Sequence, residues 1–238
     1  MIGLGTIINA GAIVVGGLLG LLLKNALPQR ISDTLTKAIG ICVLFIGLSG
    51  ALQNMFTIED GALSVGGTMM TIFSFIGGSI LGGALDLEGR LERFGVWLRK
   101  RAGADGDSGF LNGFLTASLT VCIGAMAVVG AINDGLFGDI SLLVTKSILD
   151  AIIIMVMSAT MGKGCIFSAI PVALFQGLVT LFARFLQPVM TAQATSNLAL
   201  TGSILVFCVG VNLIRPQTFR TANMLPSVVI AVIYALLF

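Results

Sequence analysis

Residues 146–164, KSILDAIIIMVMSATMGKG, place a lysine and an aspartate four residues apart in a stretch apolar enough to lie in lipid. This spacing puts Lys146 and Asp150 on one face of a helix. If the helix starts near residue 141, a rise of about 1.5 Å per residue places Asp150 roughly 13 Å into a hydrocarbon core about 30 Å thick. A carboxylate exposed to lipid at that depth is unfavourable by several kcal/mol unless it takes up a proton. The helix face that carries both residues must therefore contact protein or water.

Two interpretations of the pair compete. In the first, Lys146 and Asp150 neutralise each other and hold their segment against its neighbours. In the second, Asp150 binds a cation or a proton, while Lys146 adjusts its proton affinity or binds an anionic group. Ionisable residues this deep in a membrane are functional by default expectation, so the sequence favours the second interpretation.

Other polar side chains in the apolar segments could converge on the same cavity. Taken singly, each is more typical of a hydrogen bond between helices than of a ligand contact. Together they predict a polar vestibule that opens on the outer side of the membrane. The candidate binding residues beside the pair are Asn9, Gln176, Asn133, Asp134 and Asn212, with Gln53 and Asn54 at an outer segment end.

Enzyme chemistry has little support in this composition. Histidine is absent, and no nucleophile motif or close pair of aspartates appears. The four cysteines lie in or beside apolar runs without CxxC spacing and are typical of packing residues. We therefore expect no catalytic site, no metal and no cofactor. The net charge of +2 is too small to favour binding of nucleic acid.

The composition indicates a membrane protein. The chain of 238 residues is 56% hydrophobic and only 10% charged, whereas soluble domains are about a quarter charged. The expected fold is an all-α polytopic transmembrane bundle, a single domain over residues 1–238. About eight apolar segments can be cut from the sequence. They are residues 2–23, 38–56, 62–85, 112–132, 141–161, 165–186, 197–214 and 223–238, and a broken helix within 133–164 is an open alternative.

The distribution of charge predicts an orientation. With eight spans, most of the 13 lysine and arginine residues fall in the odd-numbered connections, and acidic residues such as Glu59 and Asp139 fall in the others. The positive-inside rule then places both termini outside. Residues 1–23 lack a basic start and run directly into Lys24, which is typical of a retained first span and not of a cleaved signal peptide.

Residues 86–101, DLEGRLERFGVWLRKR, predict an amphipathic helix. Its stripe of Leu87, Leu91, Phe94 and Leu98 is surrounded by charged residues and the only tryptophan. Such a helix is typical of the cytoplasmic headgroup layer. It could sense lipid, bind a partner, or simply anchor the ends of two spans.

Internal repetition suggests helical hairpins used more than once. Gly16-x-x-x-Gly20 and Gly78-x-x-x-Gly82 each lead into a basic stretch, and 42–52 aligns with 122–132. A fainter match of 17–28 with 177–188 would be an inverted copy, as in many secondary transporters. Small-xxx-small faces bring helix backbones together, and one of them is a candidate homodimer interface. These faces are Ala12/Gly16/Gly20, Ser74/Gly78/Gly82 and Ala169/Ala173/Gly177.

Four stretches carry a resemblance to a known family. CIGAMAVVGAINDGLFGD (122–139), KSILDA (146–151), FSAIPVALFQG (167–177) and TANMLPSVVIA (221–231) resemble the YqgA/YdfK-like family of uncharacterised bacterial integral membrane proteins. The resemblance extends over essentially the whole chain. It implies a bacterial inner-membrane location and supplies no activity, so no residue role is carried over from it.

Two functional hypotheses follow from the sequence. The first is a transporter or channel for an ion or small polar solute, with its site near Lys146 and Asp150. The second is a non-transporting scaffold or sensor subunit that acts through the helix at 86–101. Membrane lipids are the expected surroundings in either case.

Overall fold

The computed structural model describes all residues except 25–27, 60–61, 105–108, 123 and 238. Apart from one hairpin of strands, the described chain is helical. The elements are α1 (Leu4–Lys24), α2 (Gln29–Met55), β1 (Phe56–Glu59), β2 (Ala62–Val65), α3 (Thr68–Ala84), α4 (Leu87–Arg101), α5 (Phe110–Cys122), α6 (Ala125–Phe137), α7 (Ser141–Met161), η1 (Lys163–Ser168), α8 (Ala169–Leu181), α9 (Ala183–Leu186), α10 (Ala192–Ile214), η2 (Thr221–Met224) and α11 (Pro226–Leu237).

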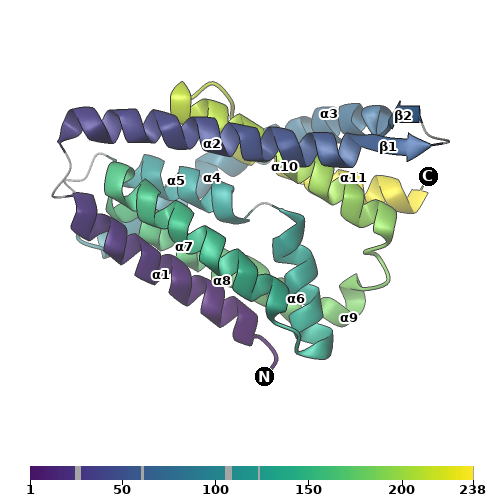
Figure 1. Cartoon of the computed structure of the whole chain (residues 1–238), viewed down its shortest axis with the longest axis horizontal. Coiled ribbons are helices and arrows are strands. Elements are labelled where there is room, and N and C mark those ends of the chain that lie inside the picture. The colour runs from purple at the N-terminus through teal and green to yellow at the C-terminus, as the bar shows by residue number, and fades with distance from the viewer. Residues whose placement is uncertain (25–27, 60–61, 105–108, 123, 238) are drawn as a thin grey trace.

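The helices form two groups that share an interface (Figure 1). In the first group, α1 lies along α7, and α5, η1 and α8 pack around them. In the second, α2 lies along α10, and α3 packs on α11. Contacts of α7 with α2, and of α5 and α6 with α10, join the groups. The largest buried apolar cluster lies in the first group and includes Ile13, Ile154, Met157 and Val172.

Glycines set the closest helix contacts. Side chains added at Gly16 and Gly20 of α1 would meet the carbonyl oxygens of Ala151 and Met155, so α1 and α7 run parallel with their backbones in contact. Gly82 of α3 is placed in the same way against the Asn223 carbonyl of η2. Close backbone approach is how helices associate in lipid, where the hydrophobic effect does not drive them together.

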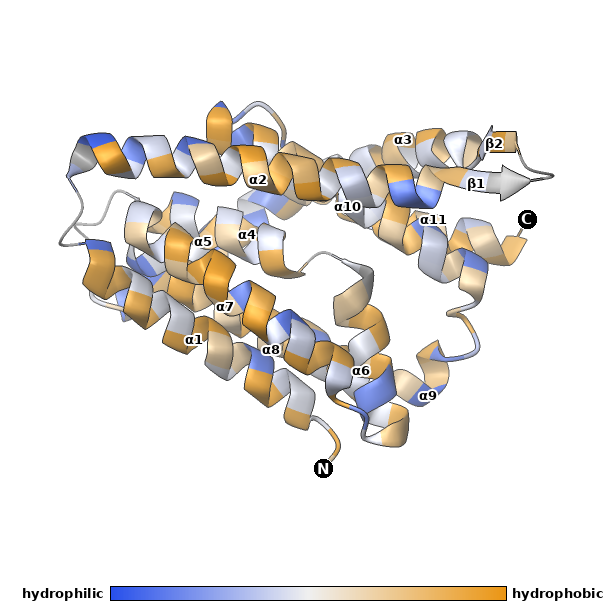
Figure 2. Cartoon of the chain, viewed as in Figure 1, coloured by the Kyte–Doolittle hydropathy of each residue, from blue (hydrophilic) through white to orange (hydrophobic). Residues whose placement is uncertain are grey.

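The outer faces of the bundle are apolar. Large side chains such as Leu18 and Leu22 of α1 and Phe45 and Ile46 of α2 are more than half exposed, and Figure 2 shows hydrophobic residues on the outward sides of these helices. Within the described residues, five helices are long and apolar enough to cross a membrane, or up to seven if each of two bent pairs is one span. These helices and their apolar outer faces indicate a helical bundle embedded in a membrane. The count of eight spans stays a prediction.

Several predicted segments have different local structures. Phe56–Glu59 and Ala62–Val65, which the predicted segments 38–56 and 62–85 place at a span end, in the connection and at a span start, form two antiparallel strands in which Phe56 pairs with Val65. The segment 112–132 is divided into α5 and α6, which bend by 62° relative to each other. Segment 165–186 is divided into η1, α8 and α9, and segment 223–238 yields only the short helix α11 after η2. Within 133–164, by contrast, α6 and α7 are joined by a turn at Gly138 and Asp139 and no helix is broken there.

Helix α4 confirms the predicted helix at 86–101 but not its environment. Leu98 is buried, Leu91 and Phe94 are half-buried, and all three pack with Phe110 and Phe114 of α5. The stripe therefore faces the protein and not the headgroup layer. The Glu88 amide donates to Asn223 Oδ1 at 2.9 Å, which ties the start of α4 to η2. Trp97 remains about half exposed, with the Arg101 guanidinium 5.7 Å from its ring centre.

Two of the three small-residue faces pack inside the chain. The face of Gly16 and Gly20 meets α7, and the face of Gly78 and Gly82 meets η2 and α11. On the third face, a side chain added at Gly177 of α8 would meet nothing within 4 Å. The homodimer prediction therefore depends on α8. Both GxxxG motifs make close backbone contacts, the first with a parallel helix and the second with antiparallel segments, and the repeat itself stays a prediction.

Candidate functional site

The Lys146–Asp150 pair is buried inside the bundle. Lys146 is 6% exposed and Asp150 is 4% exposed, and the Lys146 ammonium donates a short hydrogen bond to Asp150 Oδ2. Both residues lie in the first half of α7, on the face turned away from lipid. Because a buried charge is strongly disfavoured unless it is paired, each residue requires the other.

Lys146 also caps the end of α5. Its Nζ donates to the Val121 carbonyl oxygen at 2.8 Å, in the last turn of α5. Carbonyls in the last turn of a helix have no partner within it, and a cation there interacts favourably with the helix dipole. The chain resumes as α6 after Gly124, whose φ of 148° is a conformation that favours glycine. The ion pair thus lies at the break between α5 and α6.

Two of the predicted amides join the pair. Asn9 of α1 and Gln176 of α8 are at most 1% exposed, and Asn9 Nδ2 donates to Gln176 Oε1 at 3.3 Å. The Asn9 side chain also lies close to the Asp150 carboxyl group. Residues from α1, α7 and α8 therefore form one buried polar cluster, here called the central cluster: Lys146, Asp150, Asn9 and Gln176.

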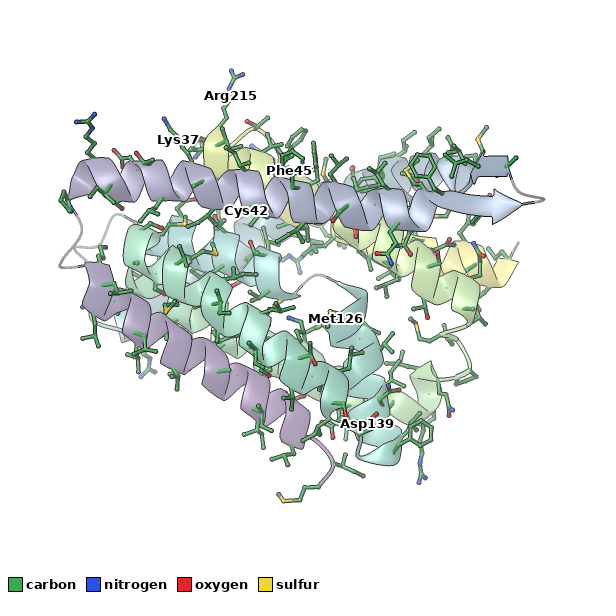
Figure 3. The ribbon with its side chains drawn as sticks, in the orientation of Figure 1. Lys37, Cys42, Phe45, Met126, Asp139 and Arg215 are labelled. Atoms are coloured by element: carbon green, nitrogen blue, oxygen red, sulfur yellow. The ribbon has the colours of Figure 1, made fainter. Side chains whose placement is uncertain are left out.

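A pocket reaches this cluster from the α2 and α10 side. Its volume is about 380 Å³, within the range of roughly 300–1,000 Å³ typical of small-molecule sites. Lys146 and Asp150 line it together with Gly124 at the span break and Met126 of α6, which Figure 3 places between α7 and α2. Its other polar lining comes from Gln53, Asn54, Thr120 and Ser203. The pocket thus offers both charges and neutral hydrogen-bonding groups to a small polar species.

Asp134 lies elsewhere and has a different contact. Its carboxylate accepts hydrogen bonds from the amides of Gly3 and Gly5, each at 3.0 Å, at the start of α1. Amides in the first turn of a helix lack partners within the helix, and the helix dipole favours a negative charge there. Asp134 therefore fixes the start of α1 to α6.

Replacing Asp134 should loosen this attachment. We expect Asp134→Ala to lower the free energy of unfolding by about 1–3 kcal/mol, because the buried Gly5 amide and the partly buried Gly3 amide lose their acceptor. Thermal unfolding of the purified variant beside the native protein measures the difference. Equal stability of the two proteins would contradict this role.

The other predicted residues are also outside the central cluster. Asn212 accepts from the Phe219 amide at 2.9 Å and donates to its carbonyl at 2.8 Å, which closes the loop after α10. Asn133 is half-buried on α6 and is not among the residues that line the pocket. At the start of α7, Asp139 accepts from the Ser141 hydroxyl and amide, and these bonds hold the pKa of its carboxyl below the usual range.

Two parts of the site were missed in the sequence. The span break at Gly124 has no proline or polar signal, only a glycine in an apolar run. The sequence also does not mark the buried hydroxyls of Thr6 and Thr180 as candidate site residues, since threonine is common on transmembrane helices. Spacing gives some signal for both, because Thr6 precedes Asn9 by three residues and Thr180 follows Gln176 by four.

The apolar outer faces, the long helices and the buried ion pair together define a polytopic helical membrane protein. The chain belongs to the family described as "Protein of unknown function (DUF554)", whose sequence model matches residues 4–236.

Two relatives support this assignment. The chain is 28% identical over 226 residues to the "Uncharacterized membrane protein YdfK" of Bacillus subtilis (strain 168), covering 95% of this chain and 93% of the relative. It is 25% identical over 235 residues to the "Uncharacterized protein YqgA" of Escherichia coli (strain K12), covering 96% and 94%. No solved structure matches the chain.

Proposed function

We propose that the chain is a membrane transporter or channel for an ion or small polar solute, with its binding site at Lys146 and Asp150. The observation that carries this proposal is the position of the pair, buried at the break of a span and on the wall of a pocket of about 380 Å³. Interrupted helices near the membrane centre are where secondary transporters bind solutes and ions.

Electrostatics support a polar substrate. Lys146 and Asp150 present one charge of each sign to the pocket, so a bound solute can replace part of their mutual interaction at either group. Gln53, Asn54 and Ser203 provide donors and acceptors without net charge. This lining suits an ion with part of its hydration shell, or a small solute with several hydrogen-bonding groups. Catalysis is not part of the proposal.

The proposed location is the bacterial inner membrane, with both termini outside. The arrangement of charged side chains supports this orientation: Figure 3 shows Lys37 and Arg215 nearer the end of the bundle at which α1 ends, and Asp139 nearer the end at which α1 begins. Basic residues concentrate on the cytoplasmic side of membrane proteins. Lipid covers the apolar outer faces, and a homodimer would use the open face of α8 at Gly177.

The alternative is a scaffold or sensor subunit acting through α4. Its apolar stripe is covered by α5, so this role would use the outer face, where Trp97 and Arg101 are exposed. That face suits a partner or the headgroups of anionic lipids. Recovery of a specific partner after mild cross-linking, together with no response to any solute, would favour the alternative.

Asp150→Asn tests the proposed site. We expect a ligand from a panel of ions and small polar solutes to raise the melting temperature of the native protein and not that of the variant. Flux of this ligand into proteoliposomes should fall at least tenfold in Asp150→Asn, while Asp139→Asn retains native flux. Undiminished flux in a folded Asp150→Asn protein would exclude the site.

A further inference from the structure

Between α1 and α8, buried polar side chains continue from the central cluster and share Asn9 and Gln176 with it. Thr6 and Asn9 belong to α1, and Gln176 and Thr180 belong to α8; all four are at most 7% exposed. None of them lines the pocket that reaches Lys146 and Asp150. We call these four residues the polar row.

The packing of the helices aligns the row. Asn9 bonds with Gln176, whereas Gly17, further along α1, meets Ile166, which precedes α8, so the two helices run in opposite directions. Along the helix axes, Thr6 therefore lies about 4.5 Å and Thr180 about 6 Å from the amide pair, both toward the end at which α1 begins. Contacts with α6 also place Thr6 and Thr180 at the same height in the bundle. Asp134 of α6 accepts a hydrogen bond from the Gly5 amide, next to Thr6, and the neighbouring Gly135 packs on the Thr180 carbonyl.

Every member of the row has a polar atom without a hydrogen-bond partner in the described part of the chain. These atoms are Thr6 Oγ1, Asn9 Oδ1, Gln176 Nε2 and Thr180 Oγ1. Buried polar atoms carry a desolvation penalty unless they are bonded, and ordered water commonly satisfies those that have no partner in the protein. Four such atoms along one interface therefore indicate a shared ligand.

The chemistry of the four atoms selects the ligand. Asn9 Oδ1 is an acceptor, Gln176 Nε2 is a donor, and a hydroxyl is both. A metal cation satisfies only acceptors, and a simple anion satisfies only donors. Water satisfies both kinds.

We propose that the polar row binds a file of water molecules that connects Asp150 with the end of the bundle at which α1 begins. Asn9 is the junction, because its side chain contacts both Gln176 and the Asp150 carboxyl group. Asp150 then has the pocket on one side and the water file on the other. A file of this kind conducts protons, so the row delivers protons to the pair; this last step alone rests on the proposed function.

Whether the melting temperature rises or falls when the two threonine hydroxyls are removed tests for bound water. In the full-length purified protein, Thr6→Val/Thr180→Val keeps the side-chain shape and removes both hydroxyls. If water satisfies these hydroxyls, the melting temperature should fall by several degrees. The matched control is Thr145→Val/Thr160→Val, whose hydroxyls bond to carbonyls of their own helix. A melting temperature that is raised, unchanged or lowered no more than in the control would overturn the proposal.

A cation in the row is a separate outcome. Replacing choline chloride by sodium chloride at equal ionic strength should leave the melting temperature of the native protein unchanged. A sodium-dependent rise that is lost in the double threonine variant would assign a cation to the row and overturn the water file.

Proton movement tests the connection to Asp150. In proteoliposomes with a pH-sensitive dye inside, an imposed pH gradient should drive proton entry that falls at least tenfold in the double threonine variant and in Asp150→Asn. Equal rates in the native protein and the double variant would overturn the connection. A failure of the proposed function appears differently, as a ligand response that persists in Asp150→Asn.

Discussion

Lys146→Met should destabilise the protein by about 3–5 kcal/mol, because it leaves the buried Asp150 carboxylate without its counter-charge. The same change removes the donor to the Val121 carbonyl at the end of α5. Equilibrium unfolding of the purified variant in mild detergent, followed by circular dichroism, measures the loss. Lys163→Met, at an exposed lysine after the same helix, is the control and should have native stability.

A second substitution separates the cost of an unpaired charge from the value of the pair. Lys146→Met/Asp150→Leu removes both charges and fills similar volume, so most of the lost stability should return. The same double variant should bind no solute in the pocket. If Lys146→Met alone were as stable as the native protein, the pair would not be buried in the way described.

Gly20→Leu should be about as damaging for a different reason. A side chain at Gly20 meets the Met155 carbonyl oxygen, and it lies 3.0 Å from Ser158 Cβ, so α1 and α7 must separate. Forced expansion of a well-packed interface costs typically about 1–3 kcal/mol. Because this interface runs along two whole helices, we expect about 3 kcal/mol or more, measured as loss of folded protein in detergent.

Gly11→Leu is the matched control on the same helix. Gly11 is exposed, and an added side chain would meet nothing within 4 Å. Leucine also has a better helix propensity than glycine by about 1 kcal/mol, so this variant should be as stable as the native protein or slightly more stable. Equal losses at Gly11 and Gly20 would show that the α1–α7 contact is not the cause.

The site was partly predictable because burial of charge follows simple rules. Lys146 and Asp150 stand out in sequence through their cost in lipid, and Asn9 and Gln176 are amides in mid-segment. The structure brings these four residues together. Asp134 and Asn212 are equally polar, but they bond to backbone groups at a helix start and in a loop. Sequence alone does not distinguish a side chain that faces a cavity from one that completes a turn.

The fold, like the site, was predictable from the sequence only in part. The boundaries of α7 match the predicted segment 141–161, since a long apolar run bordered by polar residues has few alternatives. The break at Gly124 was not predicted, because its stabilising contacts come from α7, which is distant in sequence. The stripe of α4 predicts a helix in the headgroup layer, because a helix that lies on a membrane surface has the same pattern as one that packs on a neighbour.

The parallel pairing of α1 with α7 has a consequence for biogenesis. The hydrogen-bond partners of α1 lie 129 residues away at Asp134 and 167 residues away at Gln176. At a synthesis rate of about 5–20 residues per second, the first helix waits on the order of ten seconds before its partners leave the ribosome. During that interval the glycine face and Asn9 of α1 lack their native neighbours in the bilayer. Asn9, the amide that joins the ion pair in the finished protein, is therefore the residue of α1 most in need of an interim partner from lipid headgroups, the insertion machinery or one of the helices made before α6.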